Sequence, residues 1–598
     1  MASNKTRKPN ASTSKGRNQG NSKSGKEQWK NFAKPRKQKD PTPEQVTEDI
    51  KSSSPTNDIS WYSQDPALLK AAGNFWYTWP VGRPIYRDYH VTVPDTTSAS
   101  GPWVNSDSQY DNMPGLMVLW TSPTFGVSET SDSALNLASQ QLYTFTRHLN
   151  SRTSEYDAND QMLYVAAMAS VYSMINFCER IYGSVQLYTQ ENRYFPRHLI
   201  EAQGVDYDSV ANNLANCRYA INLVINKAAS FAVPKTIRYF FRQAFNFAGY
   251  YSEGSSIKDQ IYFQAPAGVF MFDHDADGAG RIMVLGTRPY QHRNQSKKAN
   301  FIDVINDVSE LLSTLLNDND FGNMNGDILK AYGSENLIKL AEMPENYAVY
   351  PEFDEVVLEQ FRNATILRTP DFTNSAGAYK FLGGVYQDAT KGYLISELKL
   401  GEYMGTDSGL KLNARLMAAA ITLTGNSVIQ SKKPAPGMED TVESTRLHTK
   451  IRNFKCGSDG HYSGEIIPGS DIVNDVDMIV LPAAAYADAA IRVDYGNFTL
   501  LKSQFDSQGE EYIGKFFKHL AWAKSFYYAP ITYLTVLDDT QTNVLGYHPY
   551  TTPFVNMDNF AVLGLDDISR LHEACLLSLL HVESIAKVGA SNTLYPVK

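Results

Sequence analysis

The residue pair Asn57-Asp58 is a candidate for covalent chemistry on the chain itself. The side-chain amide nitrogen of an Asn can attack the main-chain carbonyl carbon of the same residue, which breaks the chain and leaves a succinimide. A neighbouring carboxylic acid assists by protonating the departing amine. An Asn-Asp pair is equally typical of a turn or a helix N-cap, because both side chains bond to nearby backbone amides. The residues alone support both interpretations.

Three other short motifs contain residues used in metal sites or in proteolysis, and each lacks a required partner. Asp273-His-Asp275-Ala-Asp277-Gly278 matches the start of a calcium-binding loop, but the twelfth position holds Val284 where a bidentate Glu is needed. We interpret this motif as an acidic hairpin tip. Asp407-Ser408-Gly409 is similar to the aspartic-protease triplet, but no second copy exists, which favours a loop. His572-Glu573 starts an HExxH pattern whose second His is replaced by Leu576, so we expect an ordinary amphipathic helix.

The common motifs of nucleotide binding and of serine hydrolases are missing from the sequence. It contains no GxGxxG, GxxxxGK[ST] or GxSxG pattern. We therefore predict a protein that is not an enzyme, apart from single-turnover self-cleavage at Asn57. We also predict that it holds no metal and no cofactor.

The first forty residues carry a charge opposite to that of the rest of the chain. They contain twelve Lys or Arg and two acidic residues, a net charge of +10. Because the whole chain has a net charge of −9, the remaining residues carry −19. The basic residues are Lys5, Arg7, Lys8, Lys15, Arg17, Lys23, Lys26, Lys30, Lys34, Arg36, Lys37 and Lys39.

These cations lie among Asn, Ser, Gly, Thr and Gln, with Trp29 and Phe32 as the large apolar side chains. Such a segment cannot bury enough surface to offset its ordering entropy, so residues 1–57 are predicted to be a disordered arm. A cationic arm on an acidic body suits a polyanion, and we expect it to bind RNA phosphates without reading bases. A segment for solubility or localisation is the alternative.

Composition indicates a globular body with two or more domains, because 598 residues exceed what one hydrophobic core supports. The 36 Tyr residues favour extensive contact surfaces, since Tyr combines apolar area with a polar tip. No stretch approaches about 18 consecutive apolar residues, and no apolar stretch follows the basic N-terminus, so neither a transmembrane helix nor a secretory signal is expected. Four widely spaced cysteines predict free thiols in a reducing compartment: Cys178, Cys217, Cys456 and Cys575.

Hydrophobic periodicity predicts a largely helical region from Ile59-Ser60-Trp61-Tyr62 to about residue 345. Helices are expected at 157–183, 208–231 and 302–316, and two strands joined by a turn at 260–270 and 282–285. After about residue 375 the pattern becomes β-rich and loop-rich. We expect a hairpin of 379–385 and 393–400, exposed loops over 425–470, a strand around 491–495, and helices at 516–528 and 565–588.

Several stretches resemble the capsid protein of picobirnaviruses, which have small segmented double-stranded RNA genomes. They run in the same order from the end of the arm to the last helix, so the resemblance covers most of the chain. Residues from about 375 to 510 match poorly, as an exposed variable region would. The stretches are Asn57-Asp-Ile-Ser-Trp61-Tyr62, Tyr143-Thr-Phe-Thr-Arg147-His148-Leu-Asn150-Ser151, Leu187-Tyr-Thr with Tyr194-Phe-Pro-Arg197, Asp320-Phe-Gly322-Asn-Met-Asn-Gly326-Asp327, Ala529-Pro530-Ile-Thr-Tyr533-Leu-Thr535 and Arg570-Leu-His572-Glu573-Ala-Cys575.

The resemblance implies an α+β fold rather than a viral jelly roll. A mainly α-helical shell domain would carry a β-rich, loop-rich protruding domain, inserted before the C-terminal helices. The expected boundaries are 1–57 for the arm, 58–345 for the first part of the shell domain, 346–514 for the protruding domain and 515–598 for the C-terminal part of the shell domain.

The resemblance also implies how the chain acts. Subunits of that family pair as two-fold dimers, which tile an icosahedral shell around the RNA genome, and the precursor is cleaved near its N-terminus by itself. This favours cleavage between Asn57 and Asp58. The implied partners are further copies of the chain, viral RNA and viral polymerase, in the virion and, during assembly, in the host cytoplasm; no particular receptor is indicated. The rival interpretations are a cellular RNA-binding scaffold and an unrecognised hydrolase.

Overall fold

The computed structural model describes residues 65–73, 84–86, 110–112, 114–150, 156–187, 195–254, 259–274, 278–367, 381–388, 390–396, 398, 423–456, 462–480, 491–495, 497–501, 526–531, 533–537, 544–549 and 559–582. The chain divides into two compact units, Met1–Trp76 and Tyr77–Lys598. In the first unit, helix α3 (Pro66–Ala72) follows Asp65, whose carboxylate accepts the main-chain N–H of Ala67 at 2.9 Å. The expected start of order at residues 59–62 lies outside the described residues. All other described elements belong to the second unit.

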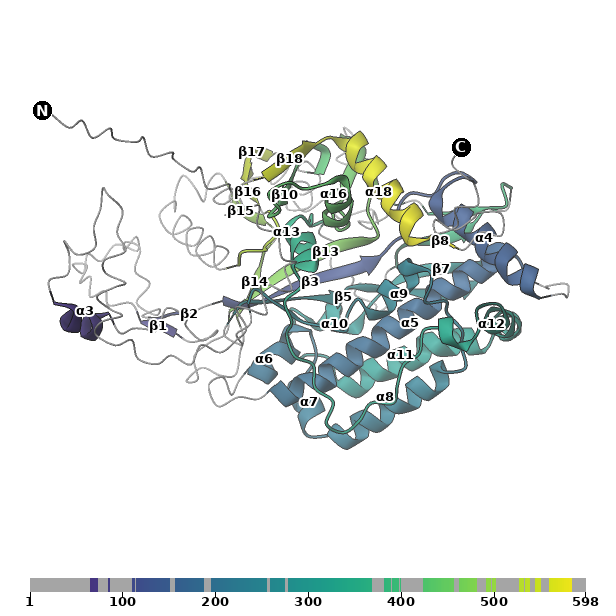
Figure 1. Ribbon diagram of the computed structural model, residues 1–598, viewed down its shortest axis with the longest axis horizontal. Coiled ribbons are helices and arrows are strands. Elements are labelled where there is room, and N and C mark those ends of the chain that lie inside the picture. Colours follow the sequence, from purple (N-terminus) through teal and green to yellow (C-terminus); the bar gives the residue numbers. More distant parts are fainter. Residues whose placement is uncertain are drawn as a thin grey trace, which may run out of the picture. The chain divides into compact units, whose positions relative to one another are not determined.

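A five-stranded sheet with the order β14-β13-β3-β5-β4 runs through the second unit (Figure 1). Its middle strand β3 (Pro114–Pro123) pairs antiparallel with β13 (Asp471–Val480) and parallel with β5 (Ile261–Pro266). Strands β14 (Ile491–Asp494) and β4 (Tyr251–Ser252) stand at its two ends. The sheet therefore joins segments from the first and the last thirds of the chain.

Strand β3 is buried on both faces. Leu116, Val118 and Trp120 belong to one hydrophobic core, whereas Met117 and Leu119 belong to another. Because successive side chains of a strand point to opposite faces, the sheet separates two cores. The continuous apolar run Leu116–Trp120 is the sequence pattern expected of such a doubly covered strand.

Helix α5 (Ala158–Ser184) forms the centre of the larger core, and almost every position along it is buried. It is a helix long and apolar enough to cross a membrane by length and composition, but its apolar window is entirely buried inside the protein, as in a core helix. Its one fully buried cation, Arg180, donates hydrogen bonds to the main-chain oxygens of Gln264 at 2.8 Å and Gly249 at 3.1 Å. These bonds satisfy a charge that burial otherwise disfavours.

Most of the remaining helices surround α5 on one side of the sheet (Figure 1). Amphipathic sequences explain them: α11, for example, buries Phe301, Val304, Ile305 and Val308 at helical spacing. The helices in contact with α5 are α4 (Ala134–Leu149), α6 (Phe195–Ala202), α8 (Leu214–Ala228), α9 (Arg238–Phe245), α11 (Phe301–Leu316) and α12 (Asn319–Tyr332). Two short helices lie between these elements: α7 (Tyr207–Ala211) connects α6 to α8, and α10 (Arg288–His292) precedes α11.

A second, antiparallel sheet has the order β6-β7-β8-β9. Its strands are β6 (Gly268–His274), β7 (Gly280–Gly286), β8 (Phe381–Gln387) and β9 (Leu394–Ile395). The hairpin of β8 and β9 turns at Gly392, whose φ of 74° is a left-handed conformation that glycine adopts without strain. The predicted β8–β9 hairpin is confirmed, whereas β7 pairs with β6 alone and not with the whole of the expected strand 260–270.

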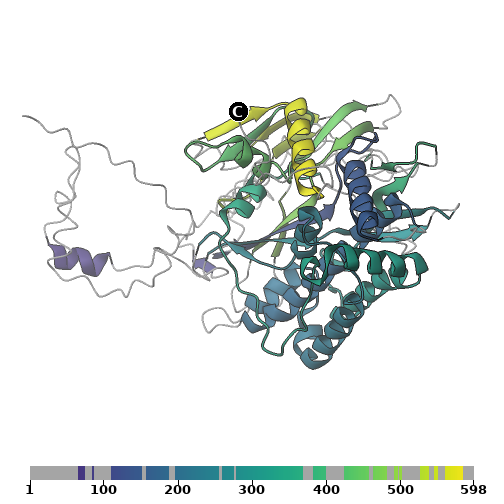
Figure 2. The ribbon, with the colours of Figure 1, turned by 45° about the vertical axis from the view of Figure 1, so that its right-hand side comes forward.

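The C-terminal half adds helices and small sheets beside the second core. The helices are α13 (Glu355–Arg362), α16 (Met438–Ser444) and α18 (Leu565–Leu579). Figure 2 shows α18 running beside α16 and α4, which it contacts. The strands are β10 (Ser427–Ser431) with β18 (Asn559–Leu563), β11 (Lys450–Cys456) with β12 (Tyr462–Ile467), and β15 (Asn497–Leu501) with β16 (Tyr533–Leu537) and β17 (Val544–Pro549). A further pair is β1 (Pro84–Tyr86) with β2 (Tyr110–Asn112).

The structure corrects four sequence-based predictions. The helix expected at 565–588 is shorter, because α18 ends at Leu579 and residues 580–582 are not helical. The exposed loops expected over 425–470 are wrong, because this stretch forms β10, α16, β11 and β12. The expected helix 208–231 is two helices, α7 and α8, with a break at Asn212 and Asn213. The expected strand 260–270 is β5 and β6, which belong to different sheets. Most of the helix expected at 516–528 lies outside the described residues.

The fold is thus a mixed α/β arrangement with a buried helical layer and several small sheets. Strand β13 lies within the segment 346–514 that was expected to be an insert, and it pairs with β3 along its length. In the described residues, the two segments therefore share one sheet. The division into shell and protruding domains remains a prediction.

Candidate functional site

The residues that the sequence singled out for function lie mostly outside the described part of the chain. This holds for Asn57 and Asp58, for all twelve cations of the arm, and for Asp407. The structure therefore tests neither the self-cleavage nor the RNA contacts. It does place the other two candidate motifs, and it shows polar clusters that the sequence reasoning missed.

The acidic motif begins on β6 of the β6–β7 hairpin, and its residues 275–277 lie outside the described part of the chain. Asp273 is the penultimate residue of β6, and its carboxylate accepts a hydrogen bond from Nη2 of Arg281 on β7 at 2.7 Å. The neighbouring His274 lies 3.7 Å from a carboxylate oxygen of Asp318. Among the described residues, no group of three or more His, Cys, Asp or Glu side chains lies close enough to hold a metal ion.

His572 belongs to the buried face of α18, as the amphipathic interpretation required. Its side chain is 3% exposed, and burial lowers its pKa to about 4. Glu573, the next residue, is exposed and points to the other side of the helix. Leu576 and Leu580 are buried, whereas Leu577 is 41% exposed.

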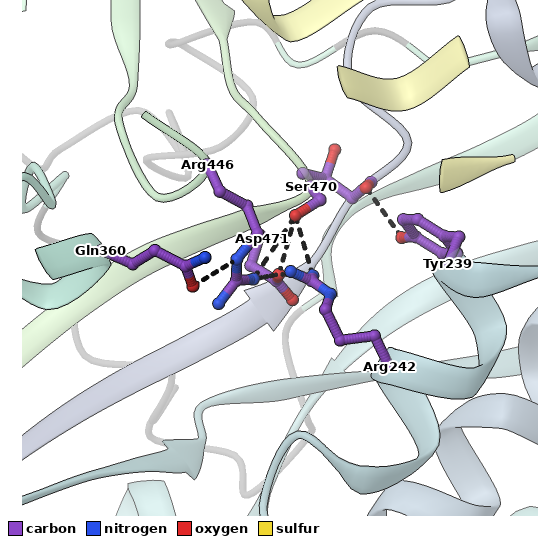
Figure 3. A network of polar contacts seen from close by, with 7 residues as sticks. Tyr239, Arg242, Gln360, Arg446, Ser470 and Asp471 are labelled. Atoms are coloured by element: carbon purple, nitrogen blue, oxygen red, sulfur yellow. Dashed lines mark hydrogen bonds and ion pairs between the residues drawn. The ribbon is translucent and has the colours of Figure 1, made fainter. Parts of the chain in front are cut away.

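A buried cluster of charged residues lies where β13 begins (Figure 3). The Asp471 carboxylate, which is fully buried, accepts hydrogen bonds from Nη2 of Arg242 at 2.6 Å and from Nη1 of Arg446. The hydroxyl of Ser470 accepts a second bond from Arg242 at 2.9 Å, and Nε of Arg446 donates to Gln360 at 2.9 Å. Burial lowers the pKa of Arg446 to about 10. The cluster joins α9, α13 and β13 by charge-assisted bonds.

A second buried cluster lies further along the same strand. The carboxylate of Asp477 accepts a hydrogen bond from the indole Nε1 of Trp120 at 2.6 Å. Arg293 donates to Asp475 at 2.8 Å and lies 3.7 Å above the ring centroid of Tyr290. The acidic residues of β13 thus meet cations and donors from the N-terminal half of the chain. Their role is to hold the middle of the sheet in register.

Ser427, His448 and Lys450 have the side chains of a hydrolase site, but they are buried. The Ser427 hydroxyl lies 2.7 Å from Nε2 of His448 and accepts a hydrogen bond from Nζ of Lys450 at 3.0 Å. Burial lowers the pKa of His448 to about 3, which makes it a weak base. None of the three is more than 9% exposed. This cluster satisfies a buried cation and offers no open face to a substrate.

Glu253 lies in a fourth cluster, at the junction of β4 with residues 526–528. Its carboxylate accepts hydrogen bonds from the Tyr262 hydroxyl and, at 2.6 Å, from the main-chain N–H of Tyr527. Burial raises the pKa of Glu253 to about 7. Lys432 donates to the hydroxyl of Tyr528 at 2.5 Å and lies 4.6 Å from the ring centroid of Tyr527. The cluster changes its charge near neutral pH.

In the described part of the chain, these clusters stabilise the fold through buried hydrogen bonds and ion pairs. A sequence model of the picobirnavirus capsid protein family matches residues 61–475. This chain belongs to the picobirnavirus capsid protein family.

A curated relative and a solved structure agree with that assignment. The capsid protein precursor of human picobirnavirus (strain Human/Thailand/Hy005102/-) is 29% identical over 538 residues, which is 88% of this chain and 91% of the relative. The X-ray crystallographic structure of the picobirnavirus capsid matches with a TM-score of 0.68 at 20% identity, over 89% of this chain and all of the solved chain. The latter likeness shows that the chain has the picobirnavirus capsid fold.

Two stretches that carried the sequence resemblance contact each other in this picobirnavirus capsid protein. Asn150, at the end of α4, donates a hydrogen bond to the main-chain oxygen of Asp327 in α12 at 2.9 Å. The Asp327 carboxylate accepts a bond from the hydroxyl of Tyr156 at 3.1 Å. Both Asn150 and Asp327 are buried. These stretches therefore fix the packing of helices, which explains their residue types without a catalytic role.

The buried acidic residues of β13 were missed by the sequence reasoning, although a signal for them exists. Asp471, Asp475 and Asp477 interrupt a run of apolar residues that has the composition of an internal strand. A charge in such a strand needs a partner when it is buried. The partners could not be named from the sequence, because Arg242 and Arg293 belong to distant segments.

Proposed function

We propose that this capsid protein assembles through dimers into a closed icosahedral shell, packages RNA with its basic arm, and loses that arm by cleavage after Asn57. The observation that carries the proposal is the separation of charge in a chain of this family. Twelve cations lie within the first forty residues, while the rest of the chain carries −19. An acidic body repels RNA, so the contact with phosphates is confined to the arm.

Exposed apolar side chains on several elements support assembly. A closed shell needs both two-fold and heterologous contacts, and therefore interfaces on more than one face of each subunit. Large apolar side chains that are exposed in the single chain are expected at such interfaces. They include Met438 (87%), Tyr219 (71%), Tyr350 (68%), Phe560 (59%), Val562 (56%) and Leu316 (51%).

For the domains, we propose the boundaries that were expected from the sequence. Residues 58–345 and 515–598 would form the shell domain, and residues 346–514 the protruding domain. Strand β13 lies within residues 346–514 but pairs with β3, which lies within residues 58–345. Under this division, the protruding segment would therefore contribute one strand to a sheet of the shell domain.

The test is to express the full chain and examine the purified protein by electron microscopy and by absorbance for nucleic acid. We expect closed particles that contain RNA. Deletion of residues 1–40 should leave particles that lack RNA, whereas replacement of the arm by an equally long Ser-Gly-Asn segment controls for its length. A protein that stays monomeric at all concentrations and salt conditions would contradict the assembly role. RNA retained without the arm would contradict the packaging role.

A further inference from the structure

Strand β18 (Asn559–Leu563) is an open edge in the described part of the chain. It pairs with one strand, β10, in an antiparallel ladder that sets Phe560 opposite Gln430 and Val562 opposite Val428. Phe560, Ala561 and Val562 are all exposed, with Phe560 at 59% and Val562 at 56%. An exposed edge strand of this kind is a template for another strand.

Hydrogen bonds on the far side of β10 show which groups of β18 face outward. The main-chain N–H and C=O of Gln430 bond to the side-chain amide of Asn363, each at 2.8 Å. Gln430 therefore turns its main-chain groups away from β18, and Phe560 opposite it is a residue of the non-hydrogen-bonded kind. It follows that Phe560, and Val562 two residues later, direct their N–H and C=O groups to the open edge.

The sequence of β18 does not protect this edge. Natural edge strands are commonly blunted by a charged side chain, a proline or a bulge. Asn559-Phe560-Ala561-Val562-Leu563 contains neither charge nor proline, and its ladder with β10 has no bulge. Such a strand is compatible with a protein that pairs it in the assembled state.

We propose that β18 pairs with β18 of a second copy of this chain, antiparallel across a two-fold axis at Ala561. This inference rests on the proposed assembly and names one surface that performs it. In this register Phe560 lies opposite the partner's Val562, and the two residues exchange both of their main-chain hydrogen bonds. An aromatic residue opposite a β-branched one is a favourable cross-strand pair. The same contact occurs twice, as a two-fold interface requires.

The register follows from the side-chain faces. A shift by one residue would place the apolar side chains of the two strands on opposite faces of the joint sheet. A shift by two would leave part of a five-residue strand unpaired. The pairing about Ala561 uses the whole strand. Because such a strand covers far less than the roughly 800 Å² per partner of a stable interface, it forms one part of a larger contact.

Cysteine cross-linking tests both the partner and the register. Ala561 opposite its own copy is a non-hydrogen-bonded pair with Cα atoms about 4.5 Å apart, within the range for a disulfide. Ala561→Cys should therefore give a covalent dimer on mild oxidation, which a reducing agent reverses. Asn559→Cys alone should stay monomeric on a denaturing gel, because its opposite residue is Leu563. The double variant Asn559→Cys/Leu563→Cys should cross-link again.

The remaining outcomes separate this inference from the proposed function. Suppose that both the wild type and Ala561→Cys form particles, but Ala561→Cys gives no covalent dimer. This result would overturn the strand pairing and leave the capsid role intact. Cross-linking of Asn559→Cys as strong as that of Ala561→Cys would also overturn it. Covalent Ala561→Cys dimers without any particles would support the pairing and contradict the shell.

A charge at the edge gives an independent readout. Phe560→Asp should raise the dimer dissociation constant at least tenfold in sedimentation experiments, without lowering the melting temperature of the monomer. Ser296→Asp is the control, because Ser296 is an exposed polar residue that lies outside β18 and outside the exposed apolar side chains named above. An unchanged dimer in Phe560→Asp would overturn the proposal.

Discussion

Nη2 of Arg242 lies 2.6 Å from the carboxylate of Asp471, although 229 positions separate the two residues in the sequence. Arg446 contacts the same carboxylate oxygen, so one buried anion holds two cations. The second guanidinium leaves a net positive charge, which the Ser470 hydroxyl and Gln360 accommodate with hydrogen bonds. The Arg242–Asp471 ion pair thus connects helix α9 to strand β13, which lies much nearer the C-terminus.

Loss of one guanidinium from this cluster should destabilise the fold. We expect Arg446→Met to lower the free energy of unfolding by about 1–3 kcal/mol, since the buried Gln360 loses its donor while Asp471 keeps its ion pair with Arg242. Denaturant unfolding monitored by circular dichroism measures this. Arg452→Met is the control: Arg452 pairs with Glu465 while both side chains are about 40% exposed, so the change should be at most about 1 kcal/mol. Equal effects in the two variants would contradict the structural role of the cluster.

The stability of the protein should fall as the pH rises through neutrality, because of Glu253. Burial raises the pKa of this carboxyl from 4.5 in the unfolded chain to about 7 in the folded protein. The protonated carboxyl therefore adds stability that is fully present below pH 4.5 and is lost as the pH rises through 7. Glu253→Gln, which keeps an acceptor and cannot ionise, should gain about 3 kcal/mol over the wild type at pH 8.

Thermal melting from pH 5 to pH 8.5 checks this expectation. The difference between Glu253→Gln and the wild type should grow with pH. The exposed Glu439 provides the matched substitution, and Glu439→Gln should show no such trend. A constant difference across the range would mean that Glu253 does not titrate near neutral pH.

The affinity of the arm for RNA should depend steeply on salt and not on base sequence. For Z phosphate contacts, the slope of log affinity against log salt is about −0.7Z to −0.9Z. Replacing Lys5, Arg7, Lys8, Lys15, Arg17 and Lys23 by Ser should halve that slope, as these are six of the twelve cations. Fluorescence anisotropy with two unrelated RNAs measures it. A slope that survives the substitution would place the RNA contacts elsewhere.

Cleavage at Asn57 should require the Asn side chain and no added protease. Asn57→Ala removes the attacking amide, so purified particles should contain the full-length chain, with assembly preserved. Thr56→Ala keeps that amide and should still be cut. Intact mass spectrometry of particles decides the matter: a new N-terminus other than Asp58, or unchanged processing in Asn57→Ala, would show that another bond is broken.

Local patterns were sufficient for two of the long helices and for one hairpin. Helices α5 and α11 were predicted to within a residue or two, because their apolar residues recur at helical spacing over many turns. The β8–β9 hairpin was predicted from its turn, where the Asp388 carboxylate accepts the main-chain N–H of Lys391 at 2.7 Å. Each of these features depends on residues that are close in sequence.

The features that failed depend on distant residues. The stretch 425–470 is rich in turn-forming residues and looked like loops. Its strands exist because β10 pairs with β18, more than a hundred residues later, and β11 with β12 around a short connection. The cluster at Asp471 could not be predicted for the same reason. Its partners are brought together by the sheet, and nothing in the local pattern identifies them.

The order of strands in the central sheet has a consequence for the synthesis and folding of each subunit. Trp120 of β3 and Asp477 of β13 are 357 residues apart, so the ribosome finishes β13 long after β3 has emerged. At about 5–20 residues per second, synthesis of that interval takes roughly 20 to 70 s. During this time β3 can pair with β5 on one side only, and its other, apolar edge stays unpaired. The concentration of nascent chains with an unpaired β3 edge, as well as the concentration of finished subunits, should therefore limit the yield of folded protein.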